Sequence, residues 1–445
     1  MSYETHRTEH SKDGSSREEY RDYKSRYSRE DGPALIIKNA DGSSAKYWYE
    51  DGLVYRKKGP AITKRRPDGS LVSEAYSELW PGNGWSTDKI FYSRNDGPAI
   101  IEYRKDGSVL KETYLCQARD EEHKRRYRSK WKYLNKPHEI YFRPDGSVEM
   151  EVYKDYSRYG GFDETQKPSV TKYDEKGRKT SETYYDGTDH VGNPQVSRDK
   201  GPAISHFWDD GSIKREEYRA LKEVNIYHDE VSFAHREDAP AVIGYSIAGQ
   251  VILEEYRQWG ILKRDNGPAV IHRYEGGAIK REEYYVDGQI QRNKNDKPAA
   301  VEYHENGKIK REEYYAWLTV DKEGKNTSVL HRDFKPAVIE FDDKGNVIRE
   351  EYRTKGVIFT PNDDEPAIIE YGKNGAVRRK EYYQNFPGMT TAGRLHRRGG
   401  PAVIEYDVKG KISKEEYYFD GGVVKPGAPT AMRLKVNIFD KRHSR

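Results

Sequence analysis

The sequence is poor in cysteine and in long apolar runs. Cys116 is the only cysteine among 445 residues, which excludes an intrachain disulfide and a cysteine-based zinc cluster. No apolar run approaches the roughly 18 residues that a membrane helix needs. The first residues, MSYETHRTEHSKDG, lack the apolar region of a classical signal peptide. We therefore expect no membrane span and no secretion by a classical signal.

The chain also has little apolar material and little net charge. Hydrophobic residues make up 34% of it, whereas compact domains carry about 45–50%, so several thick cores are excluded. Lys and Arg number 79 against 75 Asp and Glu, and the net charge of +4 gives no general electrostatic reason to bind nucleic acid. Disordered chains combine high net charge with few aromatics, but this chain has 37 Tyr. We expect it to fold by burying tyrosine faces and the stems of long charged side chains.

One spacing rule runs through the sequence: Pro, eight residues, Gly, six residues, Tyr. It holds in twelve copies: Pro33/Gly42/Tyr49, Pro60/Gly69/Tyr76, Pro98/Gly107/Tyr114, Pro137/Gly146/Tyr153, Pro168/Gly177/Tyr184, Pro202/Gly211/Tyr218, Pro240/Gly249/Tyr256, Pro268/Gly277/Tyr284, Pro298/Gly307/Tyr314, Pro336/Gly345/Tyr352, Pro366/Gly375/Tyr382 and Pro401/Gly410/Tyr417. Partial copies flank the array, one around Gly14 and one containing Pro429. The chain thus divides into an N-terminal partial repeat (1–32), twelve repeats (33–424) and a C-terminal partial repeat with a basic tail (425–445).

Each repeat has the pattern of a β-hairpin. In the copy that begins at Pro336, a β-forming run leads to a polar turn ending at Gly345, and a second run ends at Tyr352. Glycine supplies the positive φ that a tight reversal requires. Runs such as KREEYY have helical propensity, but they are short and enclosed between turn signals, which favours strands. The predicted fold is all-β: an elongated, twisted, solenoid-like antiparallel β-meander of about twelve hairpin repeats with partial capping units.

Strand parity predicts which residues share a face. The first residue after each Pro is mostly Ala, the third mostly Ile or Val and the fifth mostly aromatic, so we expect these to form continuous rows on one face. The Glu five residues after each Gly shares its face with the repeat Tyr. We expect this Glu to pair with the Arg four residues before the next Pro, a position that Lys294 takes in one repeat. The connectors vary in length, so we expect the long ones to project from one edge or end of the sheet, and a third short strand in each connector would lengthen the sheet.

Residues with catalytic or metal-binding potential follow the repeat. His235, His331 and His396 each stand five residues before a repeat Pro, which favours structural or solvent-facing roles over metal ligation. The repeated Glu is not an acid–base pair, because an active site interrupts a repeat. Gly-rich phosphate loops and nucleophile motifs are absent from the sequence. We expect no enzymatic activity, no cofactor and no metal.

The repeat unit is similar to that of a known family. Segments such as PAVIEYDVKGKISKEEYY, from Pro401 to Tyr418, resemble the MORN-related repeats (the YwqK type) found in large bacteriophage and giant-virus proteins. The resemblance covers nearly the whole chain. It implies an elongated β-meander with a binding or scaffolding role.

Specific recognition is expected in the variable connectors and in the tail, where aromatic and basic residues interrupt the repeat. The candidate partner-binding residues are Trp80, Trp85, Arg125, Arg126, Arg128, Trp131, Lys435 and Arg442. The leading hypothesis is a non-enzymatic structural or scaffolding protein, a virion component that binds other proteins, such as capsid or tail components, through its connectors and sheet face. One alternative is an intracellular adaptor or antitoxin-like binding protein. The other is a nucleic-acid-binding surface protein that uses residues 119–132 and 425–445. These hypotheses place the chain in a virion or in the cytoplasm of a host cell, and the oligomeric state stays open.

Overall fold

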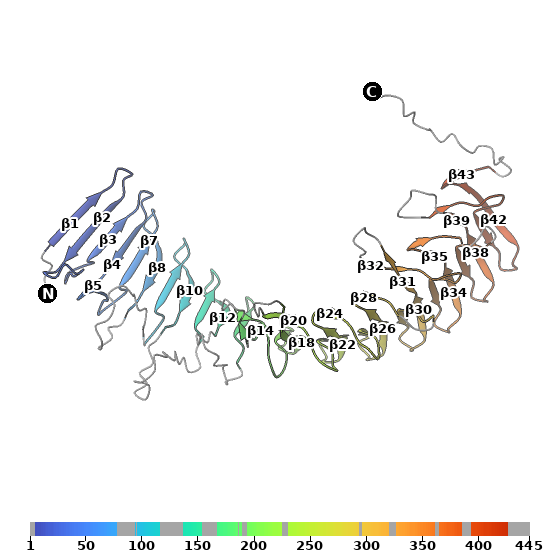
Figure 1. The fold of residues 1–445 in the computed structure, drawn as a ribbon, viewed down its shortest axis with the longest axis horizontal. Helices are drawn as coiled ribbons and strands as arrows, with labels where there is room; N and C mark the ends of the chain where they lie inside the picture. Colours follow the sequence, from blue (N-terminus) through green and yellow to red (C-terminus); the bar gives the residue numbers. More distant parts are fainter. Residues whose placement is uncertain are drawn as a thin grey trace, which may run out of the picture. The chain divides into compact units, whose positions relative to one another are not determined.

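A computed structural model describes most of the chain as β-strands and turns. It describes residues 5–77, 94, 96–115, 137–153, 167–185, 187–188, 194–224, 230–292, 296–319, 326–360, 365–384 and 393–425. The chain divides into two compact units, Met1–Lys214 with Leu221–Ser232, and Arg215–Ala220 with Phe233–Arg445. The described residues contain no helix, and hence none that could span a membrane. Their main sheet is an antiparallel meander of 27 strands (Figure 1), which confirms the predicted fold class.

The meander takes two strands from each repeat, two from the N-terminal segment and one, β43 (Gly422–Val424), that follows the last repeat Tyr. The strands of the first part are β1 (Thr5–His10), β2 (Ser16–Arg21), β3 (Leu35–Lys38), β4 (Ser44–Tyr47), β7 (Ile62–Arg65), β8 (Leu71–Ala75), β9 (Ile100–Tyr103), β10 (Val109–Thr113), β11 (Glu139–Phe142), β12 (Val148–Val152), β13 (Val170–Tyr173), β14 (Lys179–Thr183) and β17 (Ile204–Phe207). Each strand in this list pairs antiparallel with the one named before it, as β13 does with β12.

The same pattern continues to residue 424. The strands are β18 (Ile213–Glu217), β21 (Val242–Tyr245), β22 (Val251–Glu255), β25 (Val270–Arg273), β26 (Ile279–Glu283), β29 (Ala300–Tyr303), β30 (Ile309–Glu313), β33 (Val338–Phe341), β34 (Val347–Glu351), β37 (Ile368–Tyr371), β38 (Val377–Glu381), β41 (Val403–Tyr406), β42 (Ile412–Phe419) and β43 (Gly422–Val424). All twelve predicted Pro-to-Tyr segments therefore supply two strands each.

The hairpin turns explain the recurring Asp-Gly-Ser sequence. In the turn between β7 and β8, Asp68 Oδ1 accepts bonds from the Ser70 amide (2.9 Å) and hydroxyl (2.7 Å). Gly69 has a φ of 84° in this turn. Beyond the turn the strand register shifts by one residue, because Arg65 pairs with Leu71 but Lys64 pairs with Ser73, which makes a β-bulge at Val72. The repeat glycines all have positive φ: Gly42, Gly69, Gly107, Gly146, Gly177, Gly211, Gly249, Gly277, Gly307, Gly345, Gly375 and Gly410. The predicted role of the repeat glycine is confirmed.

The N-terminal segment departs from the sequence prediction in two ways. The sequence around Gly14 indicates only the second half of a repeat, but β1 and β2 form a complete hairpin there. In the first full repeat, β3 and β4 pair without the bulge, so the second strand is one residue shorter. As a result Trp48, and not the predicted Tyr49, donates its amide to Ala61 of the next repeat (2.8 Å).

The described connectors fold back on themselves. Their strands are β5 (Tyr49–Glu50), β6 (Leu53–Val54), β15 (Gly187–Thr188), β16 (Pro194–Gln195), β19 (Arg219–Glu223), β20 (Glu230–Ala234), β23 (Arg257–Gln258), β24 (Ile261–Leu262), β27 (Tyr285–Val286), β28 (Gln289–Ile290), β31 (Tyr315–Thr319), β32 (Asn326–Leu330), β35 (Arg353–Thr354), β36 (Val357–Ile358), β39 (Tyr383–Gln384) and β40 (Arg394–Leu395). They form separate two-stranded hairpins, so the prediction that connector strands lengthen the main sheet is wrong. Several have two-residue turns with positive φ at both positions, such as Lys355 (51°) and Gly356 (83°).

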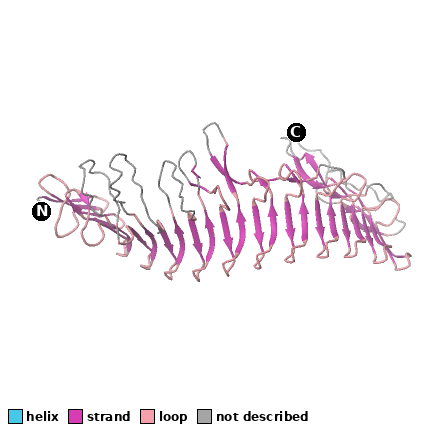
Figure 2. Ribbon diagram, turned by 90° about the horizontal axis from the view of Figure 1, so that it is seen from below, coloured by secondary structure: helices cyan, strands magenta, loops and turns pink. Residues whose placement is uncertain are grey.

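The described connectors lie along one edge of the sheet, at one set of strand ends, and the hairpin turns lie along the other (Figure 2). The core is concentrated toward the connector edge. Ala337 and Val338, the first two residues after Pro336, are both buried, whereas Ile339 is only half-buried. Burial is therefore deepest at the first two residues after Pro, which lie on opposite faces of the sheet. The second residue after each Pro lies on the opposite face of the sheet from the first. Connector residues contact that face, as Tyr285 does through its bond to Glu283, and strand parity alone did not predict that connectors would cover it.

Candidate interaction surface

Successive hairpins are joined by hydrogen bonds from tyrosine to glutamate. The hydroxyl of the fifth residue after Pro donates to the repeat Glu of the preceding hairpin. These pairs are Tyr103–Glu74 (2.8 Å), Tyr173–Glu151 (2.8 Å), Tyr245–Glu216 (2.7 Å), Tyr303–Glu282 (2.9 Å) and Tyr371–Glu350 (2.7 Å). Partial burial, followed by the bond to Glu282, raises the pKa of Tyr303. The repeat glutamate is thus a structural acceptor.

Where the fifth residue is phenylalanine, the glutamate bonds within its own strand. Glu112 precedes the repeat of Phe142 and accepts a bond from Tyr114 (2.7 Å), and Glu312 accepts one from Tyr314 (3.1 Å). Partial burial and the neighbouring glutamate raise the pKa of Tyr114 and of Tyr314 to about 12. At these two joints a tyrosine of the same strand therefore replaces the hydroxyl that phenylalanine lacks.

The repeat arginines stack on aromatic rings, so their predicted pairing with the repeat glutamate is wrong. Each guanidinium carbon lies over the aromatic ring that ends the preceding hairpin. The pairs are Arg29–Tyr20 (3.9 Å to the ring centre), Arg56–Trp48 (4.3 Å), Arg94–Tyr76 (4.2 Å), Arg198–Tyr184 (3.7 Å), Arg236–Tyr218 (3.9 Å), Arg264–Tyr256 (3.7 Å), Arg332–Tyr314 (3.7 Å) and Arg397–Tyr382 (3.8 Å). In the repeat of Pro298 the stacking residue is Arg292, over Tyr284 (3.7 Å), and Lys294 lies outside the described residues. Planar arginine suits this contact.

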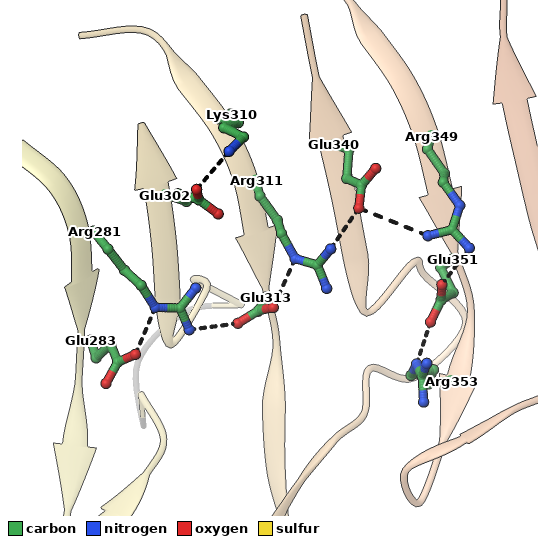
Figure 3. A network of polar contacts seen from close by, with 10 residues as sticks. All are labelled: Arg281, Glu283, Glu302, Lys310, Arg311, Glu313, Glu340, Arg349, Glu351 and Arg353. Carbon is green, nitrogen blue, oxygen red and sulfur yellow. Dashed lines mark hydrogen bonds and ion pairs between the residues drawn. The ribbon is translucent and has the colours of Figure 1, made fainter. Parts of the chain in front are cut away.

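The other face of the sheet carries an alternating ladder of arginine and glutamate (Figure 3). Arg281 bonds Glu283 (2.6 Å) in its own strand and Glu313 (2.9 Å) in the next hairpin. Arg311 in turn bonds Glu313 (2.8 Å) and Glu340 (2.5 Å). These charges neutralise one another along the sheet, so this face presents no field of one sign.

That face also has a small depression. His272, Lys280, Arg281 and Glu302 line it. Its Arg281 is engaged by the glutamates named above, and Glu302 bonds Lys310 (2.7 Å). Among the described residues, no group of His, Cys, Asp and Glu side chains is arranged to hold a metal ion.

Three repeat-position histidines join neighbouring connectors. The Nδ1 atoms of His235, His331 and His396 accept backbone amide bonds from Trp259 (3.4 Å), Lys355 (3.3 Å) and Asp420 (3.1 Å), respectively. Each donor has positive φ at the tip of the following connector hairpin. The structure thus gives these histidines a structural role, as the sequence analysis expected.

One connector carries an exposed aromatic residue on an unfavourable backbone. Phe334 lies two residues before Pro336, with a φ of 53° and a side chain that is 89% exposed. The equivalent positions with positive φ in three other repeats hold Asp238, Asp296 and Gly399, residue types that tolerate this conformation. A bulky side chain there costs on the order of 1 kcal/mol, and exposure returns no burial energy to offset it.

Ion pairs to the preceding connector fix the loop of Phe334. Asp296 accepts bonds from Arg332 Nε (2.6 Å) and Nη2 (2.8 Å), and from Lys335 Nζ (2.5 Å). Bonds from Arg332 and Lys335 lower the pKa of Asp296 well below its usual range. Arg332 also stacks on Tyr314, so both residues that flank Asp333 and Phe334 are held in place. Phe334 is therefore presented to solvent from a loop that ion pairs join to the preceding connector.

The structure does not place the predicted partner-binding residues. Trp80, Trp85, Arg125, Arg126, Arg128, Trp131, Lys435 and Arg442 all lie outside the described residues. The sequence analysis did not select Phe334. Its signal was present, because the sequence HRDFKP has phenylalanine at a turn position that holds a polar residue or glycine in the other repeats.

Comparisons with known proteins assign no family. No family model and no curated protein matches the chain. Solved structures that it matches include TcdB2-TccC3, TcdB2-TccC3-Cdc42 and TcdB2-TccC3 without its hypervariable C-terminal region, at 11–12% identity and TM-scores of 0.13–0.15. These matches cover 93% of this chain and 24–25% of the other, so the chain spans about a quarter of the length of the proteins it matches.

Proposed function

We propose that the chain is a non-enzymatic scaffolding protein that binds other proteins along its connector edge. The observation that supports this function is the loop of Phe334, where a large aromatic side chain is 89% exposed on a backbone with a φ of 53°. Folding alone favours glycine, asparagine or aspartate at such a position. An exposed aromatic anchor is what protein–protein hot spots use.

The non-enzymatic part of the proposal is supported by how the repeated ionisable groups are used. Glu282 accepts a bond from Tyr303 and its counterparts accept equivalent bonds. Arg281 and Arg311 are engaged by glutamates, and Arg332 by Asp296. These ionisable groups stabilise the contact between successive hairpins. The same arrangement recurs along the array, whereas a reaction centre would occur once.

Site-specific crosslinking tests the proposed binding edge. A photoreactive phenylalanine analogue at position 334 of the full chain should crosslink to a discrete protein in the native host. The matched control places the analogue at Val408, which is 88% exposed in the hairpin turn before Gly410, on the opposite edge. Adducts of equal yield from both positions, or from neither, would contradict binding by the connector edge.

The connectors that the sequence analysis selected require a separate test. Shortening residues 115–133 and removing residues 425–445 should leave the meander folded and weaken partner binding. If binding survives both changes together and also survives F334A, the partner uses the sheet face. The resemblance to MORN-related repeats supports a virion as the setting, and mass spectrometry of purified particles tests that part of the proposal.

A further inference from the structure

The first strand of the meander has an open edge. Within the described part of the chain, β1 pairs with β2 alone, in the register His6 to Tyr20 and His10 to Ser16. All six residues of β1 are exposed. The strand contains no proline and no lysine, the residues that proteins commonly use to block an exposed edge.

The backbone geometry shows which amides face this edge. The Tyr20 amide donates to the carbonyl of Ala34, the residue before β3 (2.8 Å), so Tyr20 and His6 form a non-hydrogen-bonded pair in the first hairpin. Because hydrogen-bonded pairs alternate along a strand, the amides and carbonyls of His6, Thr8 and His10 point away from β2. These residues can bond a further strand without disturbing the hairpin.

The sequence of β1 is complementary to itself in one antiparallel register. If Thr8 lies opposite Thr8 of a second copy, Arg7 faces Glu9 of that copy, and Glu9 faces its Arg7. Each side chain stays on the same face of the sheet only when the register shifts by an even number of residues. The neighbouring registers place Arg7 opposite Arg7, or Glu9 opposite Glu9, and like charges directly opposite are destabilising.

We propose that two copies of this chain associate antiparallel through β1, with Thr8 on the two-fold axis. In this register His6, Thr8 and His10 exchange backbone bonds with His10, Thr8 and His6 of the second copy. The two sheets continue into one another across the axis. The proposal is independent of the partner-binding function, because Phe334 lies in a different part of the chain.

Disulfide crosslinking tests both the association and its register. In the full chain with Cys116 replaced by Ser, T8C should give a covalent dimer on mild oxidation, since Cα atoms of a hydrogen-bonded pair lie about 5.5 Å apart, within disulfide range. H10C should not, because His10 faces His6 of the second copy, and H6C/H10C should crosslink again. Crosslinking of H10C alone, or of none of the three, would overturn the register.

Analytical sedimentation of the chain with no cysteine substitutions measures its oligomeric state and completes the test. The unmodified protein should be a dimer, and T8P should be a monomer, because proline removes an outward amide while leaving the β1–β2 bonds in place. Hydrogen exchange of β2 shows whether T8P keeps the first hairpin folded. A monomeric unmodified protein would overturn the proposal, as would a series of larger oligomers, which indicates head-to-tail pairing with the other end of the sheet.

Discussion

The hydroxyl of Tyr303 donates a 2.9 Å hydrogen bond to Glu282 of the preceding hairpin. The two residues come from β29 and from the strand that pairs with it, β26, and Glu282 lies opposite Val301 in their register. The bond therefore spans the joint between two repeats and adds a side-chain contact to the backbone ladder. Its recurrence at four other joints makes it a defining interaction of the array.

Removing this hydroxyl should weaken one joint. Y303F leaves the half-buried Glu282 without its donor, and we expect a local loss of about 1 kcal/mol. Hydrogen exchange should rise in β26, β29 and β30 and stay unchanged in distant repeats, because each hairpin contacts only its neighbours. Y406F is the matched control. The preceding hairpin has Lys380 at the position of the repeat glutamate, so the hydroxyl of Tyr406 does not face a repeat glutamate. Equal effects of Y303F and Y406F would show that the bond to Glu282 adds nothing.

Alkaline pH should unfold the array. The pKa values of Tyr114 and Tyr314 are raised to about 12, whereas an unfolded tyrosine titrates at about 10. The folded state therefore holds these protons more tightly, and the stabilisation is fully present below about pH 10 and is lost as the pH rises through about 12. Absorbance at the phenolate band should show tyrosines titrating late and together with loss of the β-sheet circular dichroism signal. In E312Q, Tyr314 should titrate earlier than in the unmodified protein, while Tyr114 should not change.

Replacing Phe334 should stabilise the protein. Asparagine adopts a φ near 50° more readily than phenylalanine, so F334N should relieve about 1 kcal/mol of backbone strain. The substitution should remove no packing energy, because the Phe334 side chain is 89% exposed. Thermal denaturation and exchange in residues 326–341 measure the effect. Destabilisation by F334N would mean that the aromatic ring supports the fold, and the binding argument would then fail.

The packing of one connector on another should depend on Gly393. A methyl group there would clash with the carbonyl oxygen of Ile358, a backbone atom that cannot move aside cheaply. G393A should therefore separate β39–β40 from β35–β36 at a cost of roughly 1–3 kcal/mol. G276A is the control, since that position has open space and no positive φ. Proteolysis near residue 384 should accelerate in G393A alone, and a protected G393A would show that the two hairpins do not need this contact.

The sequence by itself determined the hairpins. Pro, Gly and Tyr at fixed spacing specify two short strands and a turn, and Gly307 and Gly345 have the positive φ that this spacing requires. Local chemistry suffices here, because a turn is built from neighbouring residues and strand alternation follows from the backbone. The connector edge was also predictable, since variable lengths are tolerated only outside the paired strands.

Only the tertiary structure decided which side chains meet between repeats. The sequence predicted that the repeat glutamate pairs with arginine. In the structure, Glu282 accepts a hydrogen bond from a tyrosine, and Arg292 and Arg332 stack on aromatic rings. Partner choice depends on the offset and twist between hairpins and on connectors that cover part of one face, and none of these follows from a single repeat. Phe334 shows the same limit, because its residue type was readable in the sequence, but its exposure and φ follow from how the loop is held by Asp296 in the preceding connector.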